Sequence, residues 1–134
     1  MGDYLNILIN DPDSFMLLIR QMTKENRFNV LNSRYYDAYD GTLLHLVAYG
    51  VVFPSNRFSF DDETGVRLCN AMIENGACPM IEDGNRQLPH EVFINNVTNP
   101  GDYKTLRYLL ARANESVLEG SCQRHYYNIE NLKY

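Results

Sequence analysis

The sequence predicts an all-α protein: a short repeat stack of about three helix pairs joined by hairpin-like turns, with long insertions between the helices of a pair. Its 134 residues suit one domain, and a hydrophobic fraction of 45% beside a charged fraction of 22% is typical of a folded chain. Apolar residues recur three and four positions apart in several segments, which indicates helices. The order turn, short helix, loop, longer helix occurs twice, and we interpret it as an internal repeat.

The N-terminal part, residues 1–27, is expected to form a capping pair of helices. One helix is predicted over residues 10–26, because Asp11 is a candidate cap and Pro12 suits the first helical position. A shorter apolar segment, residues 4–9, is expected to pack antiparallel to it. The apolar stripe of the longer helix consists of Phe15, Leu18, Ile19 and Met22.

The first repeat begins with a turn-rich stretch, residues 29–41, that ends in Asp-Gly and predicts a loop or short hairpin. A short apolar helix is expected next, then an irregular segment broken by proline, then a longer helix with Gly76 at its left-handed cap. These segments are residues 42–50, 51–62 and 63–77, and the last has an apolar face of Val66, Cys69, Met72 and Ile73.

The second repeat follows the same order. It consists of a turn ending in Asp-Gly, a helix, a loop and a helix with Leu106, Leu109 and Leu110 on one face. The four segments are residues 78–84, 86–96, 97–102 and 103–113. Residues 115–134 remain as a C-terminal tail or cap.

Residues 40–48, "DGTLLHLVA", resemble the Thr-Pro-Leu-His-x-Ala signature of ankyrin repeats, with Leu43 in the place of the proline. Residues 72–79, "MIENGACP", resemble the family's Leu-Leu-x-x-Gly-Ala-Asp-Pro ending, with Cys78 where aspartate is usual. The resemblance covers residues 28–114. It implies a stack of helix pairs that binds another protein without catalysis.

The second copy of the ankyrin pattern, "DGNRQLPHEV" followed by "LRYLLARAN", is more degenerate. Arg86 replaces the threonine, Pro89 intrudes, and Ala113 stands where glycine is expected. From Thr42 to Arg86 the step is 44 residues, whereas an ankyrin repeat takes about 33. The surplus lies between the two helices of the first repeat, and a second surplus lies at residues 95–102. Stacked repeats would bring the two insertions side by side on one face.

Thr42 and His45 are expected to be structural residues. Thr42 stands where a helix begins, and His45, three residues on, can reach back to the turn as in a capping box. The alternative for His45 is a catalytic or metal-binding role. His90 is expected to be structural or exposed to solvent, and Cys69 to behave as a small hydrophobic residue.

Two groups of residues are candidates for binding a partner protein. The first insertion offers Phe53, Arg57, Phe58 and Phe60, and aromatic residues and arginine are enriched at interface hot spots. The alternative is a loop that folds its phenylalanines onto its own repeat. The two turns offer Tyr35, Tyr36 and Tyr39, then Met80 and Ile81. The alternative for these is packing between neighbouring hairpins.

Composition argues against several other functions. The net charge is −5 and Lys and Arg do not cluster, so no nucleic-acid partner is expected. The longest membrane-like run, residues 43–53, is too short to span a bilayer, so no membrane partner is expected. Three cysteines without a signal peptide suggest an intracellular, cytoplasmic protein, or a nuclear one, or one in the host cytoplasm if it is an effector.

No catalytic motif is present: the glycines do not form a phosphate loop, and no Gly-x-Ser-x-Gly, His-Glu-x-x-His or Cys-x-x-Cys occurs. Cys122 and His125 supply half of a zinc site, and four ligands are needed. We therefore expect no enzyme activity, no metal, no cofactor and no small-molecule substrate. An enzyme using Cys78 or Cys122 with a histidine is the weakest alternative.

The predicted function is protein–protein recognition, as an adaptor or competitive inhibitor. The resemblance implies a range that includes host-directed effectors and regulators of transcription factors. The main alternative is a structural subunit of an obligate complex.

Overall fold

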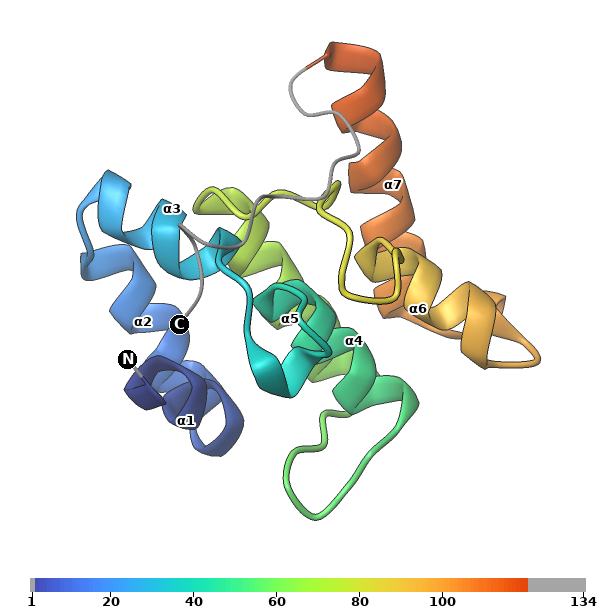
Figure 1. The fold of residues 1–134 in the computed structure, drawn as a ribbon, viewed down its shortest axis with the longest axis horizontal. Coiled ribbons are helices and arrows are strands. Elements are labelled where there is room, and N and C mark those ends of the chain that lie inside the picture. The colour runs from blue at the N-terminus through green and yellow to red at the C-terminus, as the bar shows by residue number, and fades with distance from the viewer. Residues whose placement is uncertain (1, 121–134) are drawn as a thin grey trace.

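The computed structural model describes residues 2–120, and within them the chain is helical (Figure 1). The elements in chain order are α1 (Gly2–Asn10), α2 (Pro12–Gln21), α3 (Lys24–Asn32), η1 (Tyr36–Ala38), α4 (Leu43–Val52), α5 (Asp62–Glu74), α6 (Pro89–Asn96), η2 (Pro100–Asp102) and α7 (Lys104–Glu119). The predicted all-α class is therefore confirmed. None of the helices in this part of the chain is long and apolar enough to cross a bilayer.

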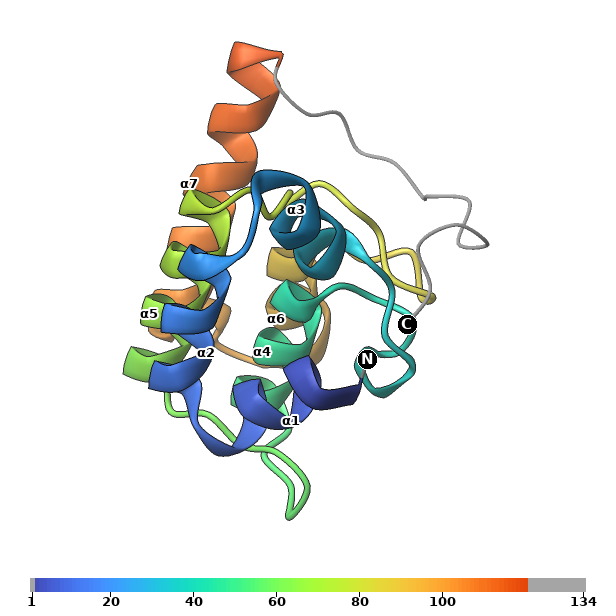
Figure 2. The same cartoon turned by 90° about the vertical axis from the view of Figure 1, so that its left-hand side faces the viewer.

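The helices other than α3 form two layers, which lie side by side in Figure 2. One layer contains α1, α4 and α6, and the other contains α2, α5 and α7. Helix α4 packs on α5 and α6 packs on α7, while α4 also contacts α6 and α5 also contacts α7. The core lies between the layers, and its fully buried side chains include Phe15, Leu31, Leu44, Leu68, Phe93 and Leu109.

The N-terminal part differs from the prediction. The helix expected over residues 10–26 ends at Gln21, and Thr23 starts a third helix by accepting the backbone N–H of Asn26 at 3.2 Å. Helix α3 then continues to Asn32, through residues expected to be a loop and across the predicted boundary at residue 27. It was missed because α3 has almost no apolar periodicity, so only its cap signals a helix.

Asn32 joins the end of α3 to the end of α5. Its fully buried side-chain amide donates to the carbonyl of Gly76 at 2.9 Å, and its oxygen accepts the backbone N–H of Cys78 at 2.7 Å. Gly76 has a φ of +113°, which a side chain rarely tolerates. The predicted left-handed cap at Gly76 is therefore confirmed.

The helix predicted over residues 86–96 starts later than predicted. Helix α6 begins at Pro89, and the Leu88 N–H donates to the Glu91 carboxylate at 2.9 Å. Leu88 thus takes the place of Thr42, and Glu91 takes the place of His45. Arg86 therefore lies before the helix rather than at its start, and Pro89, at the first helical position, loses no intrahelical hydrogen bond.

The start of α7 is capped by another helix. Asp62, in the first turn of α5, accepts the Lys104 N–H at 2.7 Å, the Thr105 N–H at 3.0 Å and the Thr105 hydroxyl at 2.7 Å. Burial raises the pKa of Asp62, but these hydrogen bonds outweigh it and lower the pKa overall. Helix α7 continues to Glu119, so the predicted tail boundary at residue 115 falls inside a helix.

Candidate functional site

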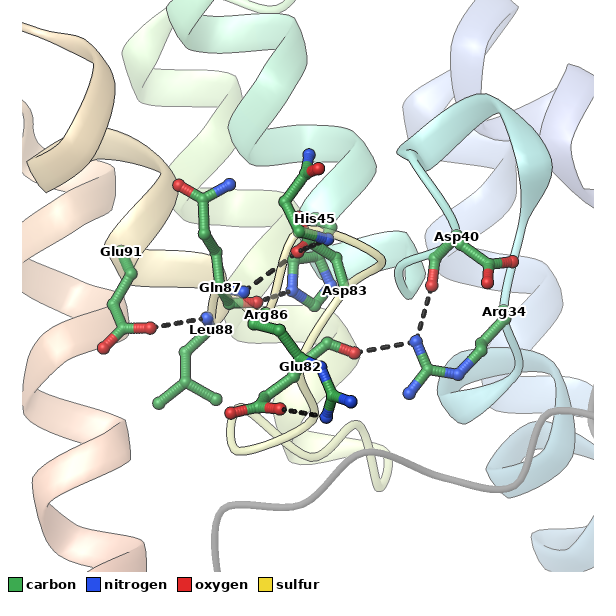
Figure 3. Close-up of polar contacts among 10 residues, drawn as sticks. Arg34, Asp40, His45, Glu82, Asp83, Arg86, Gln87, Leu88 and Glu91 are labelled. Atoms are coloured by element: carbon green, nitrogen blue, oxygen red, sulfur yellow. Dashed lines mark hydrogen bonds and ion pairs between the residues drawn. The ribbon is translucent and has the colours of Figure 1, made fainter.

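Thr42 and His45 form a closed network at the start of α4. The backbone N–H of Thr42 donates to Nδ1 of His45 at 2.9 Å, and the Thr42 hydroxyl lies 3.1 Å from the same nitrogen. Both residues are fully buried. Because Nδ1 accepts, the ring proton sits on Nε2, which donates to the carbonyl of Gln87 at 2.8 Å (Figure 3).

Burial lowers the pKa of His45 from 6.5 to about 4, although Asp83 and the Gln87 carbonyl favour the charged form. The ring is neutral at pH 7 with both nitrogens satisfied. His45 therefore connects its own helix to the next hairpin, as expected of a structural residue, and its hydrogen bonds leave no ring nitrogen for a metal.

The hairpins at residues 33–41 and 78–88 are bonded to each other. Nη1 of the buried Arg34 donates to the carbonyls of Asp40 at 2.6 Å and Glu82 at 2.7 Å (Figure 3). The Gly84 N–H donates to the carbonyl of Tyr39 at 2.8 Å, and a Cβ at Gly84 would lie 2.8 Å from that oxygen. The two hairpins thus form one platform rather than two independent loops.

Tyr49 ties α4 to this platform. Its hydroxyl donates to the carboxylate of the buried Asp83 at 2.5 Å and accepts from the Gln87 side chain at 3.1 Å. Burial and the Asp83 carboxylate raise the pKa of Tyr49. Hydrogen bonds to the second hairpin therefore fix the position of the Tyr49 ring.

A pocket of about 780 Å³ opens between the first hairpin, the end of α4 and the first insertion. Its walls are aromatic and charged. They consist of Tyr36, Asp37, Tyr39, Asp40, Tyr49, Phe53, Pro54, Ser55, Arg57 and Phe58. Residues from two separately predicted binding groups therefore line one cavity.

Contacts across the pocket give it a defined shape. The ring centroids of Tyr39 and Tyr49 lie 4.6 Å apart, and those of Tyr49 and Phe53 lie 6.4 Å apart. An ion pair of 2.9 Å between Arg57 and Asp37 links the insertion to the hairpin. The Arg57 side chain is 63% exposed, so this pair adds little stability.

Two residues in the wall have a left-handed backbone. Tyr39 and Asp40 have φ values of 53° and 62°, in the region that glycine adopts most easily. Aspartate tolerates this conformation, but for tyrosine it costs about 1–3 kcal/mol. The Tyr39 side chain is 58% exposed, so core packing does not account for it. Strained, exposed side chains of this kind cluster at ligand-binding sites.

The structure divides the predicted partner-binding residues into two sets. Tyr36, Tyr39, Phe53, Arg57 and Phe58 line the pocket, and Tyr36 is 85% exposed. The other four are buried in the chain: Tyr35, Phe60, Met80 and Ile81. The prediction that these four contact a partner is corrected, because their side chains belong to the core.

The buried residues have clear packing roles. The Tyr35 hydroxyl donates to the carbonyl of Val30 at 2.8 Å. Met80 packs with Leu88 and Ala113 in a small cluster against α7. Phe60 folds the insertion back onto α4, where a Cβ at Gly50 would lie 2.4 Å from its ring. For Phe60 the alternative interpretation of the insertion therefore holds, because the loop folds this side chain onto the chain itself.

Sequence reasoning missed half of the wall residues: Asp37, Asp40, Tyr49, Pro54 and Ser55. Asp37 and Asp40 flank the tyrosines in "RYYDAYDG", so their position beside Tyr36 and Tyr39 was a usable signal. Tyr49 carried no such signal, because it stands inside an apolar helix. The second insertion, residues 95–102, does not line this pocket.

Within residues 2–120, no cluster of three His, Cys, Asp or Glu side chains could hold a metal ion. Cys69 is a free thiol, and burial raises its pKa, so it packs as a small hydrophobic residue. Cys122 and His125, which the sequence offers as only half of a zinc site, lie outside the described residues. Comparisons with protein families, with curated proteins and with solved structures find no match for this chain.

Proposed function

We propose that this chain is an ankyrin-type stack that binds a partner protein without catalysis, as an adaptor or competitive inhibitor inside a cell. The partner would contact the surface formed by Tyr36, Tyr39, Phe53, Arg57 and Phe58, which we call the aromatic pocket.

Three features support an ankyrin-type stack. A hairpin precedes each of the helix pairs α4/α5 and α6/α7, and successive pairs pack in the same two layers. At the start of the first helix of each pair, a side chain accepts the backbone N–H three residues before it: His45 accepts from Thr42, and Glu91 accepts from Leu88. The hydrogen bond from His45 to Gln87 links one hairpin-and-helix unit to the next, as stacking of repeats requires.

The aromatic pocket is the observation that carries the binding proposal. Tyr36, Tyr39 and Phe53 are 85%, 58% and 49% exposed, an unusual amount of apolar ring surface for residues that gather at one place. Tyrosine, phenylalanine and arginine are also the residues most enriched at protein interfaces. The pocket is open rather than enclosed by core residues, which suits a protruding side chain of a partner.

Affinity capture from a cell lysate tests the proposal. The test protein carries Tyr36→Ser and Phe53→Ser, because both side chains are exposed and their loss should leave the fold intact. The control carries Leu17→Ser and Ile94→Ser, which removes two exposed apolar side chains that do not line the pocket. Circular dichroism confirms that both variants fold.

We expect the unaltered chain and the control to retain a specific partner that the pocket variant loses. Equal capture by all three proteins would contradict the assignment of the pocket. Loss of the partner by the control alone would move the binding surface to α2 or α6.

A subunit of an obligate complex is the second candidate, because α7 carries an uncovered apolar face. Leu110, Val117 and Leu118 lie seven and eight residues apart and are 37%, 60% and 86% exposed. Size-exclusion chromatography with light scattering separates the candidates. A stable monomer at micromolar concentration argues against the obligate subunit, whereas aggregation relieved by Val117→Ser and Leu118→Ser supports it.

A further inference from the structure

We infer that Cys78 and Cys122 form a disulfide that opens and closes by thiol–disulfide exchange, so that the redox state of the surroundings decides whether the C-terminal segment is tied to the second hairpin. Three observations carry the inference: the bonding state of Cys78, the groove that Cys78 shares with the end of α7, and the position of Cys122 in the sequence. The inference does not depend on the proposed protein binding, because this groove shares no residue with the aromatic pocket.

The three cysteines of the chain leave one pairing. Cys78 is in a disulfide bond, whereas Cys69 is a free thiol with no exposed surface. Burial also raises the pKa of Cys69, so its thiol does not supply the thiolate that exchange needs. The remaining cysteine, Cys122, is therefore the partner that we assign to Cys78.

The fold brings Cys78 close to the end of α7. Cys78 and Glu119 line one groove of about 570 Å³, together with residues at the end of α5 and in the last turns of α7. Cys122 follows Glu119 by three residues, which span at most about 10 Å when extended. A disulfide needs its two Cα atoms to lie about 4.4–6.8 Å apart. Residue 122 can therefore reach Cys78 across this groove without a shift of α7.

Cys78 is held in position by contacts that do not involve its sulfur. Its backbone N–H donates to the buried side chain of Asn32 at 2.7 Å, and the Asn32 amide also donates to the carbonyl of Gly76. Pro79 follows and restricts the backbone. Reduction of the disulfide removes none of these contacts, so Cys78 stays at the groove and can be oxidised again.

The position of Cys78 makes its disulfide accessible to small thiols. The residue is only half-buried and lines a groove at the surface, in contrast to the fully buried Cys69. Exposed disulfides are the ones that exchange readily and serve regulation, whereas shielded ones are structural. Disulfides in a reducing cytosol are also mostly transient or redox-sensing. A bond at this place is therefore suited to opening and closing rather than to permanent support.

The exchange uses a small disulfide such as glutathione disulfide as the oxidant. One protein thiolate attacks a glutathione sulfur and releases a glutathione thiolate, which leaves a mixed disulfide. The second protein thiolate attacks the protein sulfur of that mixed disulfide and releases the other glutathione thiolate. In sum, both cysteines lose an electron and a proton, and glutathione disulfide gains them to become two glutathione thiols. Excess reduced glutathione drives the same steps backwards.

Oxidation should stabilise the second helix pair. The bond closes a loop over residues 78–122, which contains α6 and α7. A crosslink of this kind restricts the unfolded chain more than the folded one. We expect the oxidised chain to melt about 5–15 °C above the reduced chain, measured by circular dichroism in glutathione disulfide and in reduced glutathione.

Alkylation followed by mass spectrometry identifies the bond in the full chain. The protein is equilibrated with glutathione disulfide, denatured and treated with iodoacetamide, with and without prior reduction. We expect one alkyl group per chain before reduction, on Cys69, and three after it. Peptide mapping without reduction should recover one linked pair that contains Cys78 and Cys122. Excess reduced glutathione, added to the folded chain, should restore three alkylated thiols.

Two variants separate the switch from a general effect of oxidant. Cys122→Ser should melt at the temperature of the reduced chain and should not respond to glutathione disulfide. Cys69→Ala is the matched control: it removes a buried thiol and lowers both melting temperatures, but the difference between the oxidised and reduced forms should remain. Loss of that difference in Cys69→Ala with its retention in Cys122→Ser would assign the bond to the wrong cysteine.

The inference is overturned if the chain in glutathione disulfide carries three alkyl groups before reduction, or if the linked peptides join two chains. It is also overturned if the bond in the folded chain resists excess reduced glutathione, since the disulfide would then be a permanent crosslink. None of these results bears on the aromatic pocket, which the lysate capture tests separately.

Discussion

Nε2 of His45 donates a hydrogen bond to the main-chain carbonyl of Gln87, 2.8 Å away in the next hairpin. The opposite nitrogen of the same ring accepts the N–H of Thr42. One buried, neutral side chain therefore completes the start of α4 and joins it to the second hairpin. The two functions can be separated by substitution, because glutamine at the third helical position can reach back to the cap but is shaped differently from an imidazole.

We expect His45→Ala to lower the free energy of unfolding by about 2–4 kcal/mol, because it leaves the buried Thr42 N–H and Gln87 carbonyl without their partner. His45→Gln should lower the free energy of unfolding by about half as much, since glutamine can retain the hydrogen bond to Thr42. Urea denaturation followed by circular dichroism measures both. Equal losses in the two variants would mean that the cap contributes nothing.

The same ring predicts a pH dependence. Burial lowers the folded-state pKa of His45 from 6.5 to about 4, so between these values the unfolded chain binds the proton and the folded chain does not. The contribution of His45 to the free energy of unfolding is therefore constant above about pH 6.5. It is lost as the pH falls toward 4. The loss attributable to His45 is about 3 kcal/mol.

The measurement is the free energy of unfolding from pH 7.5 to 4, compared between the unaltered chain and His45→Gln. Carboxylates titrate in both proteins, so the difference between the curves isolates His45. We expect the two curves to converge as the pH falls. Parallel curves would show that His45 titrates normally.

Asp62 is expected to matter more for stability than its acidic neighbour. Asp62→Ala removes the acceptor for two backbone N–H groups and a hydroxyl at the start of α7, and should lower the free energy of unfolding by about 1–2 kcal/mol. Glu63→Gln breaks only the exposed pair with Lys104 and should change it by less than about 0.5 kcal/mol. Thermal unfolding at neutral pH compares them, and a larger effect of Glu63→Gln would refute this ranking.

The turn before α4 and the ends of α4 and α5 were predictable because several local signals agree there. The Asp-Gly turn, the Thr42 cap, the reach-back of His45 and the left-handed Gly76 each have a physical cause within a few residues of sequence. The pocket was predictable in part for the same reason. Exposed aromatic residues in a turn and in a proline-broken loop have no local packing partner, and Tyr36 and Phe53 are indeed exposed.

The remaining features depend on tertiary contacts that the local pattern does not contain. Phe60 was assigned to a partner because the sequence gives no sign of the space beside Gly50 that its ring fills. Helix α7 was cut short because Ala113 is its last buried residue, so the turns beyond it do not pack in the core. The cap at its start comes from Asp62 in another helix. Glu91 was missed because the ankyrin pattern has histidine, not glutamate, at the third helical position.

Arg86 gives a final prediction, because it lies not at the helix start, where the sequence placed it, but in the turn before. Its φ of 62° is strained for any side chain except that of asparagine or aspartate, and its side chain is 68% exposed. Arg86→Gly should therefore raise the free energy of unfolding by about 1 kcal/mol, since the surface pair with Glu82 that it removes contributes little.

Asn85→Gly is the matched control, because Asn85 is not among the residues with positive φ. There glycine only adds freedom to the unfolded chain and should lower stability by about 0.5–1 kcal/mol. Urea denaturation decides between them: a loss of stability in Arg86→Gly would mean that the arginine side chain stabilises the turn by more than its strained backbone costs.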